Sequence, residues 1–451
     1  MESKHKFADI RVPIEEDNVA IKRIEDKCRQ CGLCAIVCKE KMSVYGSYNL
    51  CQTKDNAICV GCGQCVNACP FGAIEERSEL ENVLSALQDN DKIVTFSIAP
   101  AVRVAFGEEF CLPVGTNVER KLVSLCKKLG ANFVFDVTFG ADLTIMEEAS
   151  ELLERIKNNT NLPMITSCCP AWVKFAEMFF PQNLSNLSTC KSPIAMQGSV
   201  IKSYFAKVYD IDPKNIVNVV ITPCTAKKME IRRQELSQNV IQNMDFCLTT
   251  RELATLAKQK NIDIETLKDE QFDELLSRGS GAGVIFGATG GVMEAALRTS
   301  YYLQTNTNPP KDFVEYSQFH TLSDIKTAEV KLGEKTLKVC VVNGLKNARD
   351  LLEKINKGEV YFDFIEVMAC IGGCSGGGGQ PKTTIHSQQE ICSKRIQCLI
   401  DADKNDDVRF CHENLDIVSL YKNFLTKPLS EKSKQFLHTT YKDCSKNLKG
   451  E

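Results

Sequence analysis

The sequence predicts a large α/β domain built on parallel strands, preceded by a small α+β domain rich in cysteine. Two observations lead to this prediction. Short apolar runs alternate with amphipathic helical stretches over most of the 451 residues, a pattern typical of parallel strands covered on both faces. Nine of the 23 cysteines lie between Cys28 and Cys69, which sets the first part of the chain apart.

Composition limits the classes of function. The chain is 43% hydrophobic and 25% charged, with a formal net charge of −3, as expected of a globular protein with a sizeable core. No basic run supports nucleic-acid binding, and no polybasic patch or long apolar stretch supports membrane attachment. The opening stretch "MESKHKFADIRVPIEED" lacks the apolar region of a signal peptide. We therefore expect a cytoplasmic protein that binds neither nucleic acid nor membrane.

Eight cysteines of the N-terminal region form one pattern twice. A reducing cytosol does not maintain a disulfide framework, so this many cysteines indicate metal ligation or redox chemistry. The pattern C-x2-C-x2-C-x3-C resembles that of two-cluster bacterial ferredoxins, in which the fourth cysteine of each run binds the other cluster. The resemblance implies two [4Fe-4S] clusters, one on Cys28, Cys31, Cys34 and Cys69, the other on Cys59, Cys62, Cys65 and Cys38. A pair of zinc sites is the alternative, although zinc modules usually show two separated C-x2-C pairs.

A helix is expected to connect the two domains. Ser78 and Glu81 have the spacing of a capping box, and apolar residues follow at helical spacing. We therefore place an N-terminal segment at residues 1–26, the two-cluster domain at 27–75 and the connector helix at 76–91.

Beyond residue 91, five runs are too short for helices and rich in β-branched and aromatic residues, namely "IVTFSIA", "NFVFDV", "IVNVVIT", "KVCVVNG" and "YFDFIEVM". We predict strands at all five. Between them lie amphipathic stretches such as "NVERKLVSLCKKLG", a predicted helix with Gly130 just past its end.

Three cysteine-bearing stretches follow predicted strands, the first of them after a further short run at Met164 and Ile165: "TSCCPAW" with Cys168 and Cys169, "TPCTAKKME" with Cys224, and "MACIGGCSGGGGQP" with Cys370 and Cys374. Open α/β sheets build their binding crevices at the carboxyl ends of their strands. We therefore expect these cysteines to converge on one site, although each taken alone could be a buried structural cysteine.

These three stretches, in this order, resemble the signature motifs of the [FeFe]-hydrogenases, the iron-only hydrogenases. "FGADLTIMEEASEL" and "SGAGVIFGATGGVMEAALR" add to the resemblance, which runs from the first cysteine run almost to the C-terminus. It implies an α+β ferredoxin-like N-terminal domain followed by a large α/β H-cluster domain with parallel sheets flanked by helices. On this reading the catalytic domain spans 92–384, and a C-terminal helical segment, 385–451, packs on it.

The resemblance also implies a cofactor site. Cys169, Cys224, Cys370 and Cys374 would bind the cubane of the H-cluster, and Cys374 would bridge it to a two-iron subsite carrying CO, cyanide and an azadithiolate. Lys227 would pair with a cyanide, whereas its neighbour Lys228 is expected at the surface. The other residues expected around the cofactor are Pro100, Ala101, Thr222, Pro223, Phe286, Met368, Gly372 and Gly373. Glycines suit a motif whose backbone cradles a cluster or adopts a positive φ.

A proton path follows from the same resemblance. It would run from Cys168 through Glu148 and Ser188 to Glu151, with Arg155 near the exit. Spacing alone would instead assign the two glutamates and Arg155 to a solvated salt-bridge face of a helix. Cys190, two residues from Ser188, has no ligand spacing but could perturb the path, and the five histidines are scattered outside the cluster runs.

Four positions depart from the commonest pattern of the family: Ala171, Ile194, Thr222 and Ala226 stand where many members have glycine, glutamine, methionine, and serine or arginine. Most of these residues are expected to line the two-iron pocket. They would remove a thioether and hydrogen-bonding groups that tune the cluster, which indicates a divergent subgroup.

The function implied is reversible reduction of protons to H2 with electrons from ferredoxin or flavodoxin, after hydrogenase maturation proteins have installed the two-iron unit. Two alternatives use the same scaffold. One is a hydrogen-sensing hydrogenase, and the other is a non-catalytic iron-sulfur assembly protein, which would not be expected to keep Cys168, Lys227 and the whole glycine motif. A simple ferredoxin-type carrier would leave the large domain unexplained.

Overall fold

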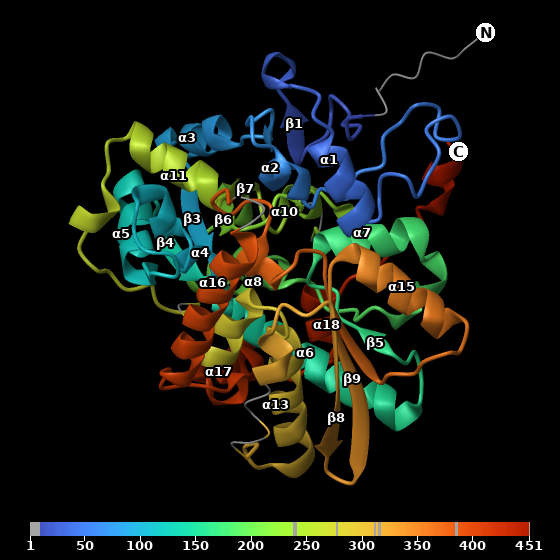
Figure 1. Ribbon diagram of the computed structural model, residues 1–451. Coiled ribbons are helices and arrows are strands. Elements are labelled where there is room, and N and C mark those ends of the chain that lie inside the picture. The colour runs from blue at the N-terminus through green and yellow to red at the C-terminus, as the bar shows by residue number, and fades with distance from the viewer. Residues whose placement is uncertain are drawn as a thin grey trace.

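The computed structural model describes residues 10–237, 241–276, 278–310, 313, 317–383 and 387–450. Two four-stranded sheets organise the large domain, and a two-stranded sheet belongs to the small N-terminal domain (Figure 1). The boundary expected between residues 384 and 385 lies outside the described residues.

The strands are β1 Ile21–Arg23, β2 Ile74–Glu76, β3 Ile93–Ile98, β4 Phe133–Asp136, β5 Met164–Ile165, β6 Ile216–Thr222, β7 Phe246–Thr249, β8 Ile325–Leu332, β9 Lys335–Asn343 and β10 Phe364–Met368. The α-helices are α1 Leu33–Ile36, α2 Gln64–Ala68, α3 Leu80–Gln88, α4 Pro100–Arg103, α5 Glu119–Leu129, α6 Val137–Asn158, α7 Pro170–Phe179, α8 Pro193–Val200, α9 Ala206–Val208, α10 Lys227–Glu230, α11 Thr250–Gln259, α12 Gly281–Val284, α13 Gly291–Thr305, α15 Leu345–Asn356, α16 Gln388–Lys404, α17 Leu415–Leu420 and α18 Glu431–Leu437.

The first large sheet has the order β4-β3-β6-β7 and is parallel throughout. Its central strands, β3 and β6, are buried along nearly their whole length, in agreement with the continuous apolar runs that predicted them. Residues of α3, α5 and α11 pack with this sheet in one hydrophobic cluster. Helix α5 ends at Gly130, whose φ of 110° gives the left-handed termination expected from the sequence.

The second large sheet has the order β5-β10-β9-β8. Its first three strands are parallel, and β8 is an antiparallel edge strand. Helices α7 and α15 pack on one face of this sheet and α6 and α13 on the other. The long helix α6 begins directly after β4 of the first sheet, so it joins the two sheets and lies between them (Figure 1).

The N-terminal domain sits on top of this assembly, in blue in Figure 1. Strand β1 pairs antiparallel with β2, and both surround a small core that includes several of the cysteines. Because β1 lies within the expected N-terminal segment and β2 ends at Glu76, this sheet crosses both boundaries placed from the sequence, at residues 26 and 75.

The expected capping box at the start of α3 does not form. Glu79, rather than Ser78, is the N-cap residue, and the Ser78 hydroxyl accepts only from the backbone N–H of Leu80, at 3.3 Å. The buried carboxylate of Glu79 instead accepts from the backbone N–H of Cys247, at 2.7 Å, and pairs with Arg232. A tertiary contact thus positions this helix.

None of the helices in the described part of the chain combines the length and apolarity needed to cross a bilayer.

Candidate active site

A cavity lies where the carboxyl ends of strands from both large sheets meet. Strands β3 and β6 lead into Pro100–Ala101 and Thr222–Cys224, whereas β5 and β10 lead into Cys168–Cys169 and Met368–Cys374. About 750 Å³ of space not filled by atoms lies within the cavity and its opening to solvent. The convergence expected from the three cysteine stretches is therefore present in the fold.

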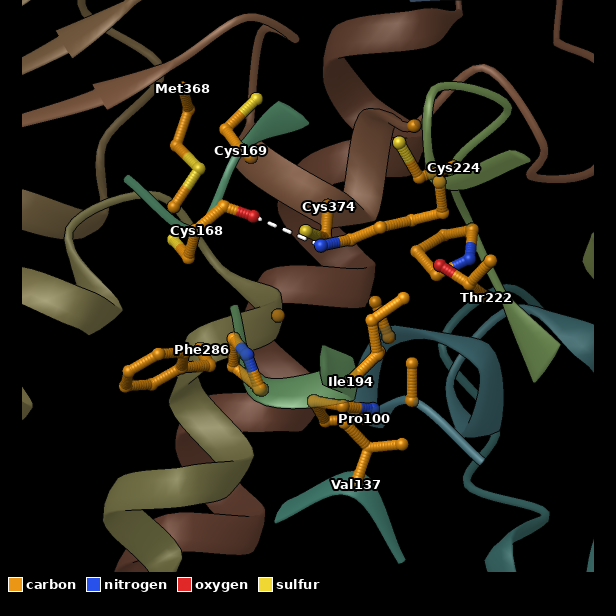
Figure 2. Close-up of a pocket in the computed structure, with 18 of the residues that line it drawn as sticks. Pro100, Val137, Cys168, Cys169, Ile194, Thr222, Cys224, Phe286, Met368 and Cys374 are labelled. Carbon is orange, nitrogen blue, oxygen red and sulfur yellow. Dashed lines mark hydrogen bonds between the residues drawn. The ribbon is translucent and has the colours of Figure 1, made fainter. Parts of the chain in front are cut away.

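The four thiols expected to bind a cubane all line this cavity: Cys169, Cys224, Cys370 and Cys374. Figure 2 shows three of them, together with Cys168, around the same space. Burial, reinforced by the neighbouring thiols, raises the pKa of Cys224 to about 11 and that of Cys374 to about 12. Metal binding replaces thiol protons, so the donor set fits an iron-sulfur cluster.

The glycine motif brings the backbone close to the cavity. Gly372 and Gly373 have φ values of +81° and +69°, in the left-handed region. A Cβ on Gly378 would lie 2.3 Å from the carbonyl oxygen of Cys62. Gly373 lines the cavity, whereas Gly372 does not, and a Cβ on Gly372 would meet Leu322 and Cys392, at 3.2 and 3.3 Å.

All the other residues expected around the cofactor line the cavity, namely Pro100, Ala101, Thr222, Pro223, Lys227, Phe286 and Met368. Of the four departures from the family pattern, Ile194 and Thr222 line it. Ala171 and Ala226 instead lie in the hydrophobic core beside the second sheet, so two of the four residues line the cavity rather than most of them, as was expected. Val137 and Ala141, which also line the cavity, were not expected from the sequence, although their i,i+4 spacing, starting at the last residue of the predicted strand "NFVFDV", could have indicated them.

Lys227 supplies a positive charge to the cavity wall. Its Nζ donates to the carbonyl oxygen of Cys168, at 3.1 Å, and to Glu230 Oε2, at 2.8 Å (Figure 2 shows the first contact). Burial lowers the pKa of Lys227, but Glu230 and the nearby thiols outweigh it and raise the pKa overall. Its neighbour Lys228 is completely buried and paired with Glu252, so the surface position expected for it is wrong.

Cys168 and Glu148 are the innermost members of the expected proton path. Burial, with Glu148 and Cys169 adding to it, raises the pKa of the Cys168 thiol well above its ordinary value. Burial also raises the pKa of Glu148 to about 8, and its Oε2 has no hydrogen-bond partner among the described residues. A buried carboxyl of this kind is protonated at neutral pH.

Ser188, Glu151 and Arg155 continue from Glu148 toward the surface. The Ser188 hydroxyl donates to Glu151 Oε2, at 3.2 Å, and lowers the pKa of Glu148 against the larger effect of burial. Arg155 Nη2 donates to Glu151 Oε1, at 2.6 Å, and both residues line a pocket at the surface. Since the three charged residues are buried, the solvated salt-bridge face suggested by spacing alone is wrong.

The N-terminal cysteines gather in two groups that each combine both runs. Cys28, Cys31, Cys34 and Cys69 line one small cavity. In the other group, Cys65 is influenced electrostatically by Cys62, Cys59 and Cys38. Burial, with Cys59 and Cys34 adding to it, raises the pKa of Cys38 to about 12. The grouping has the exchange of fourth cysteines found in two-cluster ferredoxins.

The second group, with Cys38, Cys59, Cys62 and Cys65, adjoins the large cavity. Gln64 Nε2 donates to Cys370 Sγ, at 3.1 Å, and to the carbonyl oxygen of Gly376, at 3.0 Å. Thr225 Oγ1 donates to the carbonyl oxygen of Gly61, at 2.6 Å. The N-terminal domain is thus hydrogen-bonded directly to the loops that carry Cys224, Cys370 and Cys374.

Three family models match this chain. The iron only hydrogenase large subunit, C-terminal domain, matches residues 92–378, the iron hydrogenase small subunit matches 389–444, and the 4Fe-4S binding domain matches 53–75.

Similar proteins and structures agree with these matches. The chain is 44% identical to the NADP-reducing hydrogenase subunit HndD of Solidesulfovibrio fructosivorans, over 94% of this chain and 75% of that protein. It is 28% identical to the cytosolic iron-sulfur assembly component 3 of Mus musculus, over 87% of this chain and 84% of that protein. A structure of apo [FeFe]-hydrogenase HydA1 from Chlamydomonas reinhardtii matches with a TM-score of 0.72 and 38% identity, covering 81% of this chain and 99% of that one. The chain therefore belongs to the iron-only, or [FeFe]-, hydrogenase family of iron-sulfur oxidoreductases, which work with an H-cluster.

Proposed function

We propose that this protein catalyses the reversible reduction of protons to H2, with electrons from ferredoxin, flavodoxin or a similar low-potential carrier. One observation carries the proposal. A cavity lined by the four thiols expected to bind a cluster also contains a fifth thiol, Cys168. The buried Glu148 influences that thiol electrostatically, and Ser188 is hydrogen-bonded to Glu151, which lines a pocket at the surface. An electron carrier or an assembly scaffold would not need such a connection.

The residues fit the cofactor of the family. Cys169, Cys224, Cys370 and Cys374 would hold the cubane of an H-cluster, with Cys374 shared with a two-iron subsite supplied by hydrogenase maturation proteins. The two N-terminal groups of cysteines would hold two further [4Fe-4S] clusters. When bound, the H-cluster supplies electrons and the iron at which protons are reduced or H2 is split. Lys227 would bind an anionic ligand, because a buried ammonium makes strong charge-assisted hydrogen bonds.

The side chains of the protein would control the protons. Cys168 holds a proton on Sγ at the cavity wall. After this proton is given up into the cavity, Cys168 takes another from the carboxyl group of Glu148. Glu148 is then reprotonated from Glu151 through the Ser188 hydroxyl, which accepts one proton as it releases another. The apolar walls of the cavity would exclude water, which would otherwise exchange protons with Cys168 directly and bypass this path.

The energetics favour a reversible reaction. Seven pH units at about 59 mV each place the proton/H2 couple near roughly −410 mV at pH 7, almost level with a plant-type ferredoxin at about −400 mV. The relative that is 44% identical is named as a subunit of an NADP-reducing hydrogenase, so a partner subunit linked to NADPH is the alternative donor. Both donors are consistent with the cytoplasmic location expected from the sequence.

The direct test is H2 evolution under strict anaerobiosis, using protein with reconstituted cubanes and a synthetic two-iron complex. Reduced methyl viologen supplies electrons first, and reduced ferredoxin and NADPH are then compared. We expect rapid turnover that falls at least roughly 100-fold in Cys168→Ser, since a positioned proton donor contributes about 10²–10⁴-fold. Cys126→Ser, which removes a buried thiol of helix α5 packed against the first sheet, serves as the matched control and should keep its activity.

Infrared spectra of the same sample separate the alternatives. Bands from bound CO and cyanide without turnover would favour a hydrogen-sensing protein. A full complement of iron without such bands would favour an iron-sulfur assembly protein, the function for which the relative that is 28% identical is named.

A further inference from the structure

Arg155 stands at the surface end of the proposed proton path, but it cannot relay protons. A guanidinium stays charged at any physiological pH and has no acceptor. Its Nη2 donates to Glu151 Oε1, at 2.6 Å, and to the carbonyl oxygen of Leu187, at 2.7 Å, while Nη1 donates to the carbonyl oxygens of Asn186 and Asn161, at 3.0 and 3.1 Å. Arg155 therefore holds Glu151 in place, and another group has to exchange protons with solvent.

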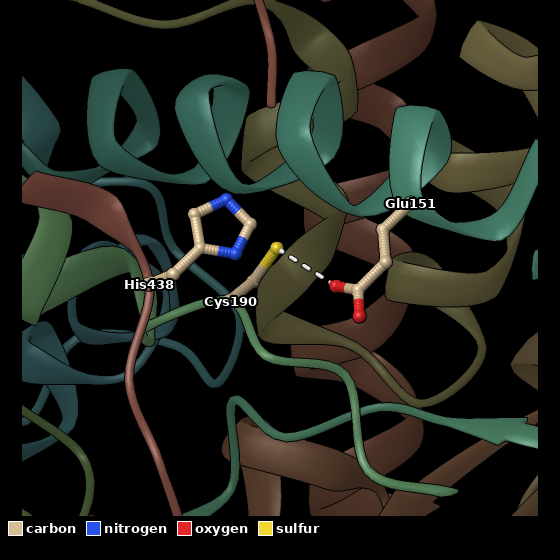
Figure 3. A group of neighbouring side chains, drawn as sticks. All are labelled: Glu151, Cys190 and His438. Atoms are coloured by element: carbon tan, nitrogen blue, oxygen red, sulfur yellow. Dashed lines mark hydrogen bonds between the residues drawn. The ribbon is translucent and has the colours of Figure 1, made fainter. Parts of the chain in front are cut away.

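Thr189 and His438 form a second set of polar groups that leads to Glu151. Thr189 Oγ1 lies 3.1 Å from Glu151 Oε2 and 2.7 Å from His438 Nδ1. The remaining ring nitrogen, His438 Nε2, lies 3.1 Å from Glu147 Oε2. Thr189 and His438 line the same surface pocket as Glu151 and Arg155. Figure 3 shows the imidazole ring of His438 directed toward Cys190 and Glu151.

A single antiparallel backbone contact between two segments places His438 beside Thr189 and Glu151. Cys190 and His438 face each other in an isolated antiparallel bridge. The backbone N–H of Thr439 donates to Thr189 and that of Lys191 to Leu437, both at 2.8 Å, so the facing pair is of the non-hydrogen-bonded kind, in which side chains lie closest. The segment matched by the small-subunit model, 389–444, thereby brings an imidazole to the acid groups of α6.

With both end carboxylates ionised, this chain of contacts needs one hydrogen more than a neutral imidazole and a hydroxyl supply. The chain Glu147–His438–Thr189–Glu151 has three contacts, and both of its ends are carboxylates, which only accept when ionised. The hydroxyl donates once and a neutral imidazole donates once, which leaves one contact without a hydrogen. An imidazolium satisfies all three contacts, because Nε2–H then donates to Glu147, Nδ1–H to Thr189, and the Thr189 hydroxyl to Glu151.

The carboxylate of Glu147 faces His438 Nε2, at 3.1 Å. Glu147 is completely buried and accepts from Tyr421 Oη, at 2.6 Å, and from the backbone N–H of Leu429, at 2.8 Å, and these two contacts fix the position of its carboxylate. The other titratable or charged groups around this site are Glu151, Glu154 and Arg155 of α6, Lys434 of α18, Cys190 and Tyr421. Burial raises the pKa of Cys190 and of Tyr421 well above their ordinary values, so neither of them competes for the transferred proton.

We infer that His438 takes up protons from solvent and passes them through Thr189 to Glu151, a role that rests on the proposed function. In the transfer, the proton on Nδ1 moves to Thr189 Oγ1 while the hydroxyl proton of Thr189 moves to Glu151 Oε2. The imidazole is left neutral, with its Nε2–H still on Glu147, and the next proton comes from water in the pocket. One proton enters and one leaves, and no electron moves. Histidine suits this step because it ordinarily gains and loses protons near neutral pH.

The test uses the cluster-loaded protein and two kinds of variant. Thr189→Val removes the hydroxyl link and Thr189→Ser keeps it, so these two variants separate proton transfer from packing. We expect Thr189→Val and His438→Ala to slow H2 evolution at least roughly 10-fold, with Thr189→Ser near the wild-type rate, since positioned proton transfer contributes about 10²–10⁴-fold and solvent can reach Glu151 in part. His412→Ala, at a histidine stacked on Tyr302, is the matched control and should keep its activity.

Chemical rescue and the pH profile distinguish a relay from a structural contact. Added imidazole should restore much of the lost rate in His438→Ala but not in Thr189→Val. The His438→Ala rate should also fall more steeply than the wild-type rate as the pH rises above neutral. The inference is overturned if His438→Ala keeps the wild-type rate at every pH, or if its loss is the same at every pH and imidazole restores none of it.

Two further samples keep this outcome separate from the proposed function. An inactive wild type carrying CO and cyanide bands would contradict the proposed function itself. A fully active Glu151→Gln would contradict any route through Glu151, and with it the role of His438. An active wild type with a slow Glu151→Gln confines the question to His438 and Thr189, whose variants then decide it.

Discussion

At the scale of single residues, Glu148 gives the clearest sign of a proton path. It is nearly inaccessible, its Oε2 has no partner among the described residues, and burial raises its pKa to about 8. A carboxyl group kept only for structure would normally be paired. The cost of leaving it unpaired is consistent with a site retained for chemistry.

The pKa of Glu148 predicts how stability depends on pH. The unfolded chain ionises this group near pH 4.5, whereas the folded protein keeps it protonated up to about 8. Its contribution is therefore complete below pH 4.5 and is lost as the pH rises through about 8, by about 1.4 kcal/mol for each pH unit between these two values. We expect Glu148→Gln to gain stability relative to wild type between pH 5 and pH 8 in denaturant unfolding of the cluster-loaded protein. A constant difference between the two proteins across that range would contradict this prediction.

At the scale of elements, the glycine motif has two separate roles. Gly372 and Gly373 make a turn with positive φ, while Gly376–Gly379 let backbones pack against one another. A Cβ on Gly378 would meet the carbonyl oxygen of Cys62, at 2.3 Å, and the Cα of Gly63, at 2.7 Å. Since both are backbone atoms of the N-terminal domain, this element sets how closely that domain approaches the cavity.

Gly378→Ala should therefore destabilise the docking of the N-terminal domain. We expect a loss of roughly 3 kcal/mol in the free energy of unfolding, at the upper end for overpacking. Gly358→Ala is the control, since its φ is +73° but its Cβ would meet nothing within 4 Å, and it should cost only about 1 kcal/mol. Equal losses in the two variants, measured by urea unfolding, would show that steric contact at Gly378 is unimportant.

The sequence anticipated those elements whose signal is local. The apolar runs of β3, β6, β9 and β10 mark buried parallel strands. By contrast, β8 was missed because an edge strand alternates exposed and buried residues, and β7, Phe246–Thr249, was missed as well. The cysteines of the two N-terminal runs carry their spacing within one motif and could be predicted, whereas Thr189 and His438 are 249 positions apart and no local pattern joins them.

At the scale of the whole molecule, Arg251 fastens the N-terminal domain to the cavity. It is buried and donates to both carboxylate oxygens of Glu76, at 2.6 and 3.1 Å, to the carbonyl oxygen of Gly378, at 2.7 Å, and to Asn67 Oδ1, at 3.3 Å. Burial raises the pKa of Glu76, but Arg251 outweighs this effect and lowers the pKa overall. One side chain thus joins β2, α2 and the glycine motif.

Arg251→Met should cost about 3–5 kcal/mol, because it leaves a buried carboxylate without its partner. The double variant Glu76→Gln/Arg251→Met should lose less than Arg251→Met alone. Since the pKa of Glu76 is lowered, the pair stabilises the fold above about pH 4.5 and loses this effect as the pH falls through the folded pKa. The difference between wild type and Arg251→Met should therefore shrink on acidification, and a difference that stays constant down to pH 3 would contradict this view of the pair.

The measurement that tests the central claim most directly is isotope exchange between H2 and D2O, because it needs no external electron carrier. The protein loaded with all its clusters should form HD and D2 from H2, and Cys168→Ser should slow this exchange strongly. Protein with the cubanes but without the two-iron unit should form neither. Absence of HD from a sample whose infrared spectrum shows bound CO and cyanide would contradict the claim that this cavity, supplied with protons through Cys168, interconverts protons and H2.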